Sequence, residues 1–472
     1  MKKTKIIGTL GPASSDPFVL EKMIKAGLNV VRLNFSHGSH AEHARRIQTV
    51  REVAAKLGQP VGILADIQGP KIRTGILNEE PLIMKEGDHF YLTVDPAKEK
   101  TPGYIYVEYP TLIKEVHPGS TIFLADGMIE MKVITVNSTD LECAVVNGGE
   151  LTSKKGVTLP GVTVNLPALM AKDRLDIEFA VQQDLDFIAI SFARKAEHLR
   201  EIRRLVESLG GNQLLIAKIE NEEGFRNSEE ILAASDGLMV ARGDLGAEVP
   251  LEEIPLLQSR LIRICNAAGK PVITATEMLE SMVRNPRPTR AEITDIAHAI
   301  QDGTDAIMLS AETAVGKYPV AAVAIMSQVA KRIEASLQYG RILASKEIGT
   351  FPNVADAISH ATCQIALDLK VVAVISSTQS GSTARMVAKY RPQAPIIATT
   401  PSAKVVQQLT LVWGVYPIMV SPASDIDTML DTSVAAAKQH GFIKQGDLVV
   451  ITAGVRTGVP GSTNLLKVHY ID

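Results

Sequence analysis

The sequence predicts an α/β protein: a (β/α)8 TIM barrel with an inserted small β-barrel domain, followed by a C-terminal open α/β domain. Eight short apolar runs predict strands, and a helical pattern follows each run. Six of the seven intervals between these runs are roughly 25 to 35 residues long, which is the spacing of such a barrel. The runs are continuously apolar, as expected of parallel strands that are buried on both faces.

The eight runs give the expected barrel, which we place at residues 1–69 and 167–340. In chain order, its predicted strands are Ile6–Leu10, Val30–Asn34, Val61–Asp66, Phe187–Phe192, Leu214–Glu220, Gly237–Asp244, Pro271–Met278 and Ala306–Thr313.

The interval between the third and fourth strands is too long for one helix and its loops. It contains alternating apolar and polar runs separated by turn signals such as Asn147-Gly148-Gly149, a pattern typical of short antiparallel strands. These strands are expected at Gly75–Leu77, Phe90–Val94, Thr121–Leu124, Met131–Val136 and Leu141–Val146. We therefore expect a β lid domain at residues 70–166, inserted in a loop at the top of the barrel.

Residues 341–472 show a different pattern, in which a helix-like stretch, Val354–Leu369, precedes further strand–helix alternation. Strands are expected near Val371–Ser376, Ile396–Thr399, Val415–Val420, Leu448–Thr452 and Leu465–Tyr470. This alternation predicts a separate open α/β domain.

The composition excludes several classes of protein. A net charge of −3 and an aromatic content of 4% argue against a nucleic-acid-binding protein. Cys143, Cys265 and Cys363 are far apart and lack metal-binding spacing, as expected of buried thiols in a reducing compartment. No apolar run reaches about 18 residues, so we expect no transmembrane helix, no membrane partner and a cytoplasmic location.

Barrel active sites are assembled at the C-terminal ends of the strands, and polar residues are concentrated there in this sequence. They are Arg32, Asn34, Ser36 and His37 at the second strand, Asp66, Ile67, Lys71 and Arg73 at the third, Lys218 and Glu220 at the fifth, Gly243 and Asp244 at the sixth, and Thr276 at the seventh. We expect these residues to converge on one site.

This inventory suits phosphoryl transfer, which needs positioning and charge neutralisation more than covalent chemistry. Arg32 and Arg73 can grip phosphate oxygens with their forked guanidinium groups, and Lys218 can stabilise charge on the moving group. Glu220 and Asp244 supply two hard oxygen ligands, which suit Mg²⁺ and leave positions for water and substrate.

Each residue also has a purely structural interpretation. A carboxylate at a strand end can cap the next helix, and Lys218 can form a structural ion pair with Glu220. Gly243 can serve a tight turn, and Thr276 can be an ordinary strand residue. The convergence of six strand ends, the five named above and the eighth, which ends in Ser310-Ala311-Glu312-Thr313, favours the functional interpretation. The absence of Gly-Lys-Ser/Thr, and of GxGxxG after the first strand, argues against P-loop and dinucleotide sites.

Several strings identify a family. Val30–Gly38, Asp66–Gly75, Met239–Gly246 and Arg287–Glu292 closely resemble those of bacterial-type pyruvate kinases, and the resemblance runs nearly end to end. It implies transfer of a phosphoryl group from phosphoenolpyruvate to ADP, giving pyruvate and ATP in glycolysis. It also implies dependence on Mg²⁺ (or Mn²⁺), closure of the inserted domain over the site, and assembly as a homotetramer.

The resemblance also implies a role for individual residues. The expected metal ligands are Glu220 and Asp244, and the expected catalytic residues are Arg32, Lys218 and Thr276. Substrate is expected at Arg32, Lys218, Gly243, Asp244 and Thr276, and the nucleotide at Asn34, His37, Arg73 and Lys155. A monovalent-cation site is implied at Asn34, Ser36, Asp66 and the Ile67 carbonyl.

Lys71 departs from many members of the family, which carry Glu at this position. Members with Lys there resemble the potassium-independent branch, and an ammonium group can supply the missing monovalent charge. We therefore expect activity without K⁺, with Asp66 available to pair with Lys71.

A hydroxyl- and glycine-rich turn follows the first strand of the C-terminal domain. It contains Ser377, Thr378, Ser380, Gly381, Ser382 and Thr383, and it opens a helix. Such a turn can cradle a phosphate, or can simply cap the helix. In the family the matching loop binds a phosphorylated effector, and the loop containing Arg456 could close over it. The choice among fructose 1,6-bisphosphate, another sugar phosphate and AMP is open.

Two other functions share part of this residue inventory. A Mg²⁺-dependent pyruvate-enolate C–C lyase would share the Glu/Asp pair and the arginine, but it would lack an inserted domain that brings Lys155 to a nucleotide. A catalytically silent relative is disfavoured because the strand-end residues Arg32, Lys218 and Thr276 are intact.

Overall fold

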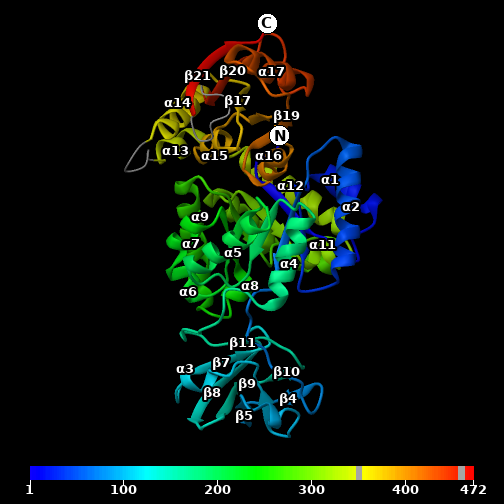
Figure 1. The fold of residues 1–472 in the computed structure, drawn as a ribbon, viewed down its shortest axis with the longest axis vertical. Helices are drawn as coiled ribbons and strands as arrows, with labels where there is room; N and C mark the ends of the chain where they lie inside the picture. The colour runs from blue at the N-terminus through cyan, green and yellow to red at the C-terminus, as the bar shows by residue number, and fades with distance from the viewer. Residues whose placement is uncertain (347–352, 455–462) are drawn as a thin grey trace.

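The computed structural model describes residues 1–346, 353–454 and 463–472. Three bodies are stacked along the long axis, with the barrel in the middle (Figure 1). The inserted sheets lie at one end, and the C-terminal domain lies at the other. The N-terminus lies near the junction of the barrel and the C-terminal domain.

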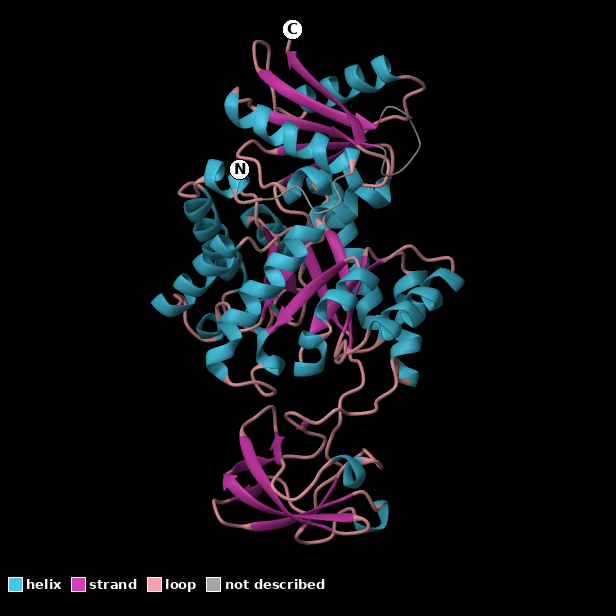
Figure 2. Ribbon diagram, turned by 90° about the vertical axis from the view of Figure 1, so that its left-hand side faces the viewer, coloured by secondary structure: helices cyan, strands magenta, loops and turns pink. Residues whose placement is uncertain are grey.

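The central body is a closed parallel barrel with strand order β1-β16-β15-β14-β13-β12-β3-β2. Its strands are β1 (Lys5–Thr9), β2 (Val30–Asn34), β3 (Gly62–Ile67), β12 (Phe187–Ile190), β13 (Leu214–Ile219), β14 (Gly237–Ala241), β15 (Val272–Ala275) and β16 (Ala306–Leu309). All eight predicted strands are therefore confirmed. Figure 2 shows the barrel strands surrounded by helices.

The barrel helices follow the strands in the expected alternation. The longer ones are α1 (Pro17–Ala26), α2 (His40–Leu57), α4 (Ala171–Gln182), α5 (Ala196–Ser208), α7 (Ser228–Ala234), α9 (Ile254–Ala268), α10 (Arg290–Asp302) and α12 (Pro319–Glu334). The short ones are α6 (Glu222–Arg226), α8 (Arg242–Leu245) and α11 (Ala311–Ala314), with 3₁₀ turns η2 (Leu251–Glu253) and η3 (Glu280–Val283), whereas the following α13 (Tyr339–Ala344) lies beside α14 (Val354–Asp368) of the C-terminal body (Figure 1). Reciprocal capping boxes, Ser39 with Glu42 and Thr289 with Glu292, begin α2 and α10.

The inserted body contains a six-stranded sheet of order β11-β7-β8-β9-β5-β6 and a two-stranded sheet, β10-β4. The strands are β4 (Leu82–Met84), β5 (His89–Thr93), β6 (Tyr104–Tyr106), β7 (Thr121–Leu124), β8 (Ile129–Val136), β9 (Asp140–Asn147), β10 (Gly149–Leu151) and β11 (Val157–Thr158), with α3 (Leu112–Glu115) and η1 (Pro96–Lys98) between them. Where a small β-barrel was expected, the described residues form an open sheet order that ends at β11 and β6.

The strand predicted at Gly75–Leu77 is wrong. Isolated bridges occur at Arg73 and Thr74, and the Gly75 amide donates to the Tyr106 carbonyl at 2.7 Å, but the next two residues direct their backbone N–H groups to side chains. The Ile76 amide donates to Glu99 Oε1 at 2.7 Å, and the Leu77 amide donates to Ser153 Oγ at 2.9 Å. Because these donors are already satisfied, no sheet ladder is needed there.

The C-terminal body is an open sheet of order β19-β18-β17-β20-β21, parallel except for the last pair. Its strands are β17 (Ala373–Ser377), β18 (Ile396–Thr400), β19 (Val415–Met419), β20 (Leu448–Gly454) and β21 (Thr463–Tyr470), which confirms all five predicted strands. The helices are α14 (Val354–Asp368), α15 (Ser382–Lys389), α16 (Ala403–Gln408) and α17 (Ile426–Gln439), with η4 (Leu409–Leu411).

Each body has its own hydrophobic core, and the three cysteines are free and buried, as expected. Among the described residues, no helix combines the length and the apolar character needed to cross a membrane.

Candidate active site

Four charged side chains from the ends of three strands, β2, β3 and β13, meet at the C-terminal mouth of the barrel, as the sequence predicts. Lys218 at the end of β13 places Nζ 3.1 Å from Asp66 Oδ1 and 3.0 Å from Glu220 Oε1. Arg32 on β2 donates from Nε to Asp66 Oδ2 at 2.6 Å. The cluster therefore joins two cations and two carboxylates from neighbouring parts of the barrel.

Burial and mutual attraction set the protonation of this cluster. Burial alone would lower the pKa of Lys218, but the charges of Asp66 and Glu220 outweigh it and raise that pKa. Burial alone would raise the pKa of Asp66, but Lys218 and Arg32 hold it below its usual value. Lys218 is therefore a charged ammonium in a site where its side chain is 11% exposed.

Glu220 is almost completely buried, and a second carboxylate lies near it. Its Oε2 accepts the Phe192 amide at 2.6 Å, and burial followed by the charge of Asp244 raises its pKa against the attraction of Lys218. Asp244, on α8, accepts Lys71 Nζ at 2.8 Å. The buried Glu220 and the partly exposed Asp244 are two hard oxygen donors that repel each other, and a divalent cation between them would neutralise both. Among the described residues, no group of three or more His, Cys, Asp and Glu side chains forms a larger metal cluster.

Thr276 has an unusual backbone conformation for a β-branched residue, with φ at 69°, and φ of the following Glu277 is also positive. Arg242 stabilises this turn by donating a hydrogen bond from Nη2 to the Thr276 carbonyl at 2.5 Å. The Thr276 hydroxyl accepts the Gly243 amide at 2.9 Å. The predicted Thr276 and Gly243 are therefore brought together, and the strain is localised at the site.

Two strand ends contribute residues that the sequence analysis missed. Ser191, after β12, accepts Lys218 Nζ at 2.7 Å and donates to the Ile67 carbonyl at 2.7 Å. Thr9, at the end of β1, accepts Arg32 Nη1 at 3.0 Å. The same strand-end rule that identified Arg32 and Lys218 would have identified both. Arg242 was also missed, although it directly precedes the predicted Gly243 and Asp244.

Comparison with known proteins agrees with this geometry. A family model described as "Pyruvate kinase, barrel domain" matches residues 1–323, and one described as "Pyruvate kinase, alpha/beta domain" matches residues 356–469. The chain is 52% identical over its whole length to a pyruvate kinase of Geobacillus stearothermophilus, of which it covers 80%. It is 47% identical to a pyruvate kinase of Clostridium acetobutylicum, with both chains covered completely.

The chain belongs to the pyruvate kinase family. It is a phosphotransferase of glycolysis, and its substrates are phosphoenolpyruvate and ADP. Pyruvate kinases in general use Mg²⁺ and K⁺. This membership decides against the lyase interpretation.

The residues that we expect to contact the nucleotide of this pyruvate kinase come from both bodies. His37, after β2, is exposed, and the Asn34 side chain accepts the Ser36 amide at 3.1 Å. On the inserted side, Arg73 donates to the Lys154 carbonyl at 3.1 Å, and Lys155 is exposed. Their part in nucleotide binding stays a prediction.

The expected pairing of Asp66 with Lys71 is wrong. Asp66 is 2% exposed and binds Arg32 and Lys218, whereas Lys71 binds Asp126 and Asp244. Two cations, Arg32 on the neighbouring strand β2 and Lys218 on β13, already compensate the Asp66 charge, so a third is not required. The Ile67 carbonyl, another member of the predicted monovalent site, accepts Ser191 Oγ.

The predicted effector turn follows β17 and opens α15, as expected. Gly381 has φ at 79°, and a Cβ there would come within 3.1 Å of Leu409 and 3.0 Å of Arg385. The hydroxyls of Ser376 and Thr378 are buried and have no hydrogen-bond partner among the residues that the structure describes. Ser380 donates to Ser382 at 3.2 Å, and Thr383 bonds Thr463 at 2.8 Å. Arg456 lies outside the described residues.

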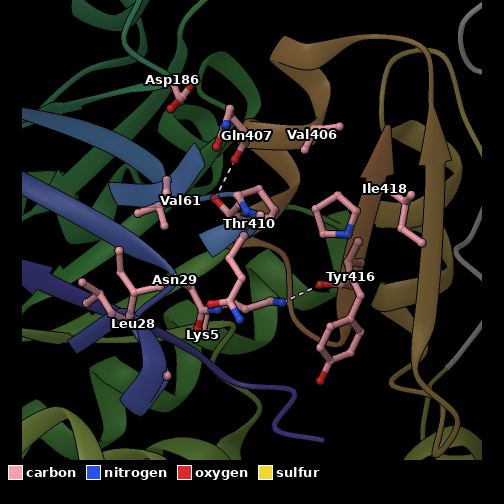
Figure 3. A pocket seen from close by; sticks show the side chains of 18 of the residues that line it. Lys5, Leu28, Asn29, Val61, Asp186, Val406, Gln407, Thr410, Tyr416 and Ile418 are labelled. Atoms are coloured by element: carbon pink, nitrogen blue, oxygen red, sulfur yellow. Dashed lines mark hydrogen bonds between the residues drawn. The ribbon is translucent and has the colours of Figure 1, made fainter. Parts of the chain in front are cut away.

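A large cavity of about 1,020 Å³ lies at the opposite end of the barrel, against the C-terminal domain. Figure 3 shows Lys5, Asn29 and Asp186 of the barrel facing Tyr416 across this space. These barrel residues are at or just before the N-terminal ends of their strands, so the cavity is separate from the site around Lys218.

Proposed function

We propose that the cluster around Lys218 is where this pyruvate kinase transfers the phosphoryl group. The observation that carries this proposal is a buried, charged Lys218 held between Asp66 and Glu220 at the end of the barrel where active sites form. An ammonium held in place in a buried site stabilises developing negative charge without reorganisation of the surrounding groups.

The roles of the surrounding residues follow from their placement. Arg32, oriented by Asp66 and Thr9, grips the phosphate of phosphoenolpyruvate. Lys218 stabilises the phosphoryl group in transit and then the enolate oxygen that is left behind. The turn of Thr276 and Gly243, with the Asp244 amide, holds the substrate carboxylate. Thr276 lies on the route by which a proton, with water as the final donor, reaches the enolate carbon.

Glu220 and Asp244 are the residues that would hold the divalent cation, Mg²⁺ or Mn²⁺. The raised pKa of Glu220, caused by burial and by Asp244, supports this assignment because the pair is short of positive charge. When bound, the cation neutralises charge on substrate and phosphoryl oxygens.

The nucleotide is proposed to lie between Asn34, His37, Arg73 and Lys155, with the inserted domain closing to exclude water. The Lys71 ammonium, which lies 2.8 Å from Asp244, supplies a positive charge from within the chain, and this supports activity without K⁺. The monovalent site of Asn34, Ser36, Asp66 and Ile67 would then be unnecessary.

Further proposals concern regulation and assembly. The turn from Ser377 to Thr383, with Arg456, binds a phosphorylated effector. The buried Thr378 hydroxyl, which has no partner within the described part of the chain, supports this. The chain forms a cytoplasmic homotetramer. Its domains are residues 1–69 with 167–340, 70–166 and 341–472, a division supported by the separate cores.

Replacing Lys218 tests the proposed function. We expect Lys218→Ala to lower kcat for pyruvate formation by at least about a thousandfold, because the variant loses a preorganised charge at the reacting group. Circular dichroism should show an intact fold. Lys270→Ala is the matched control, because Lys270 is also partly buried but donates to the Leu232 and Ser235 carbonyls at the other end of the barrel. If Lys218→Ala turned over as fast as Lys270→Ala, the assignment would be wrong.

A further inference from the structure

Lys71 joins the two bodies whose relative movement the reaction requires. It lies on the segment that leaves β3 for the inserted domain. Its Nζ is 2.8 Å from Oδ1 of Asp126, on the turn between β7 and β8, and 2.8 Å from Oδ1 of Asp244 on α8. One ammonium therefore bridges a carboxylate of the inserted domain and a carboxylate of the barrel.

Gly156 of the inserted domain leaves space for the Lys71 side chain. A Cβ on Gly156 would come within 2.7 Å of Lys71 Cε and 3.1 Å of Asp126 Oδ1, so the absence of a side chain leaves room for the bridge. On the barrel side, Lys71 Nζ lies 5.5 Å from the centre of the Phe192 ring. The Lys71 side chain is 17% exposed, whereas that of Asp126 is 64% exposed.

The bridge uses the carboxylate that the proposed function gives to the divalent cation. A cation bound to Asp244 would stand close to the Lys71 ammonium, and like charges at such short range repel strongly. Lys71 and the cation therefore compete for Asp244. When Lys71 leaves Asp244, the connection to Asp126 no longer ties the inserted domain to the barrel.

We propose that Lys71 is a positioning residue that holds the inserted domain to the barrel through Asp126 and Asp244, and that a divalent cation releases this latch by displacing Lys71 from Asp244. The proposal rests on the proposed function, because it needs Asp244 to be a metal ligand. This latch is a different role from the replacement of K⁺ by the Lys71 ammonium, because only the latch requires Asp126.

Direct titration with Mn²⁺, without substrates, tests the competition. Asp126→Asn should bind Mn²⁺ about threefold more tightly than wild type, because Lys71 is held less firmly on Asp244. Simple electrostatics gives the opposite sign, since removing a nearby negative charge weakens cation binding. Asp126 is on an exposed turn with φ at 57°, a conformation that Asn tolerates. Unchanged or weaker binding by Asp126→Asn would overturn the proposal.

Lys71→Met and Asp244→Asn complete the titration. Lys71→Met should bind Mn²⁺ about tenfold more tightly, because the competitor is gone; unchanged or weaker binding would overturn the proposal. Asp244→Asn should lose most of its affinity. If Asp244→Asn kept the wild-type affinity, the metal assignment would fail, and the latch with it. If Asp244→Asn lost affinity but Asp126→Asn behaved like wild type, only the latch would fail.

Energy transfer between dyes on the two bodies tests the release. Cysteines introduced at the exposed positions Lys132, in the inserted domain, and Glu207, in the barrel, can be labelled because the three native cysteines are buried. We expect Mg²⁺ to change the transfer efficiency of wild type, and metal-free Asp126→Asn to show the Mg²⁺-bound value already. Metal-free Asp126→Asn with the wild-type metal-free value would contradict the latch.

Discussion

Charged side chains at the two ends of the barrel have different partners. At the C-terminal end, Lys218 and Asp66 compensate each other, and both remain ionised. At the N-terminal end, Asp186 is 5% exposed, and Lys404, the lysine paired with it, is 3.6 Å away. Burial therefore dominates there and raises the pKa of Asp186 to about 6.

Asp186 makes the stability of the protein depend on pH. The unfolded chain loses this proton near pH 3.9, whereas the folded protein keeps it up to about pH 6. Because the folded state binds more protons in this window, its stability falls as pH rises through it. The cost above pH 6 is about 2–3 kcal/mol. Asp186→Asn should therefore be more stable than wild type at pH 8 but not at pH 4, as measured by urea unfolding.

Asp184→Asn is the control for this measurement. Asp184 also pairs with Lys404, at 2.7 Å, but its side chain is 75% exposed. We expect its replacement to change stability by less than about 1 kcal/mol at either pH. An equal effect of Asp186→Asn at pH 4 and pH 8 would show that Asp186 is charged throughout and that the argument from burial is wrong.

At the scale of elements, the barrel strands were predictable because a parallel strand that is buried on both faces needs a continuous run of apolar residues. Their ends were less predictable. The sequence predicts strands over the whole of Gly237–Asp244 and Pro271–Met278, but β14 ends at Ala241 and β15 ends at Ala275. After these strand ends the backbone leaves the strand conformation. Gly243 and Asp244 lie in α8, and Thr276 lies in a left-handed turn. That departure from the strand is what brings them into the site.

The short strands of the inserted domain show where local patterns fail. The strands β4, β6, β10 and β11 have two or three residues each, too few to show alternation, and all were missed. The pairing of Lys71 with Asp126 and Asp244 could not be predicted either. It depends on how the inserted domain sits over the barrel, and no periodicity in the sequence encodes that placement.

At the scale of the whole molecule, a buried ion pair connects the barrel to the C-terminal domain. Arg391 donates to both carboxylate oxygens of Asp305, at 2.9 and 3.1 Å, and to the Gly303 carbonyl at 2.7 Å. Its guanidinium also lies 4.8 Å from the centre of the Trp413 ring. Both members of the pair are nearly inaccessible, with side chains 6% exposed.

Removing this guanidinium should loosen the junction of the two bodies. We expect Arg391→Asn to destabilise the protein by about 3 kcal/mol, because it leaves the Asp305 charge buried without its partner. Asn suits the positive φ of 51° at this position, so the change does not add backbone strain. Calorimetry should show a lower Tm for Arg391→Asn. Arg260→Asn, which removes the exposed pair with Glu229, is the control, and equal shifts in the two variants would contradict this account.

Pyruvate release from phosphoenolpyruvate and ADP with Mg²⁺, in K⁺-free buffer and after addition of K⁺ at constant ionic strength, tests the central claim most directly. We predict the same full rate in both buffers, because the Lys71 ammonium supplies a monovalent positive charge from within the chain. Activity only with K⁺ would keep the phosphoryl transfer but contradict the role of Lys71. No activity in either buffer, even with sugar phosphates or AMP present, would contradict the assignment of the site itself.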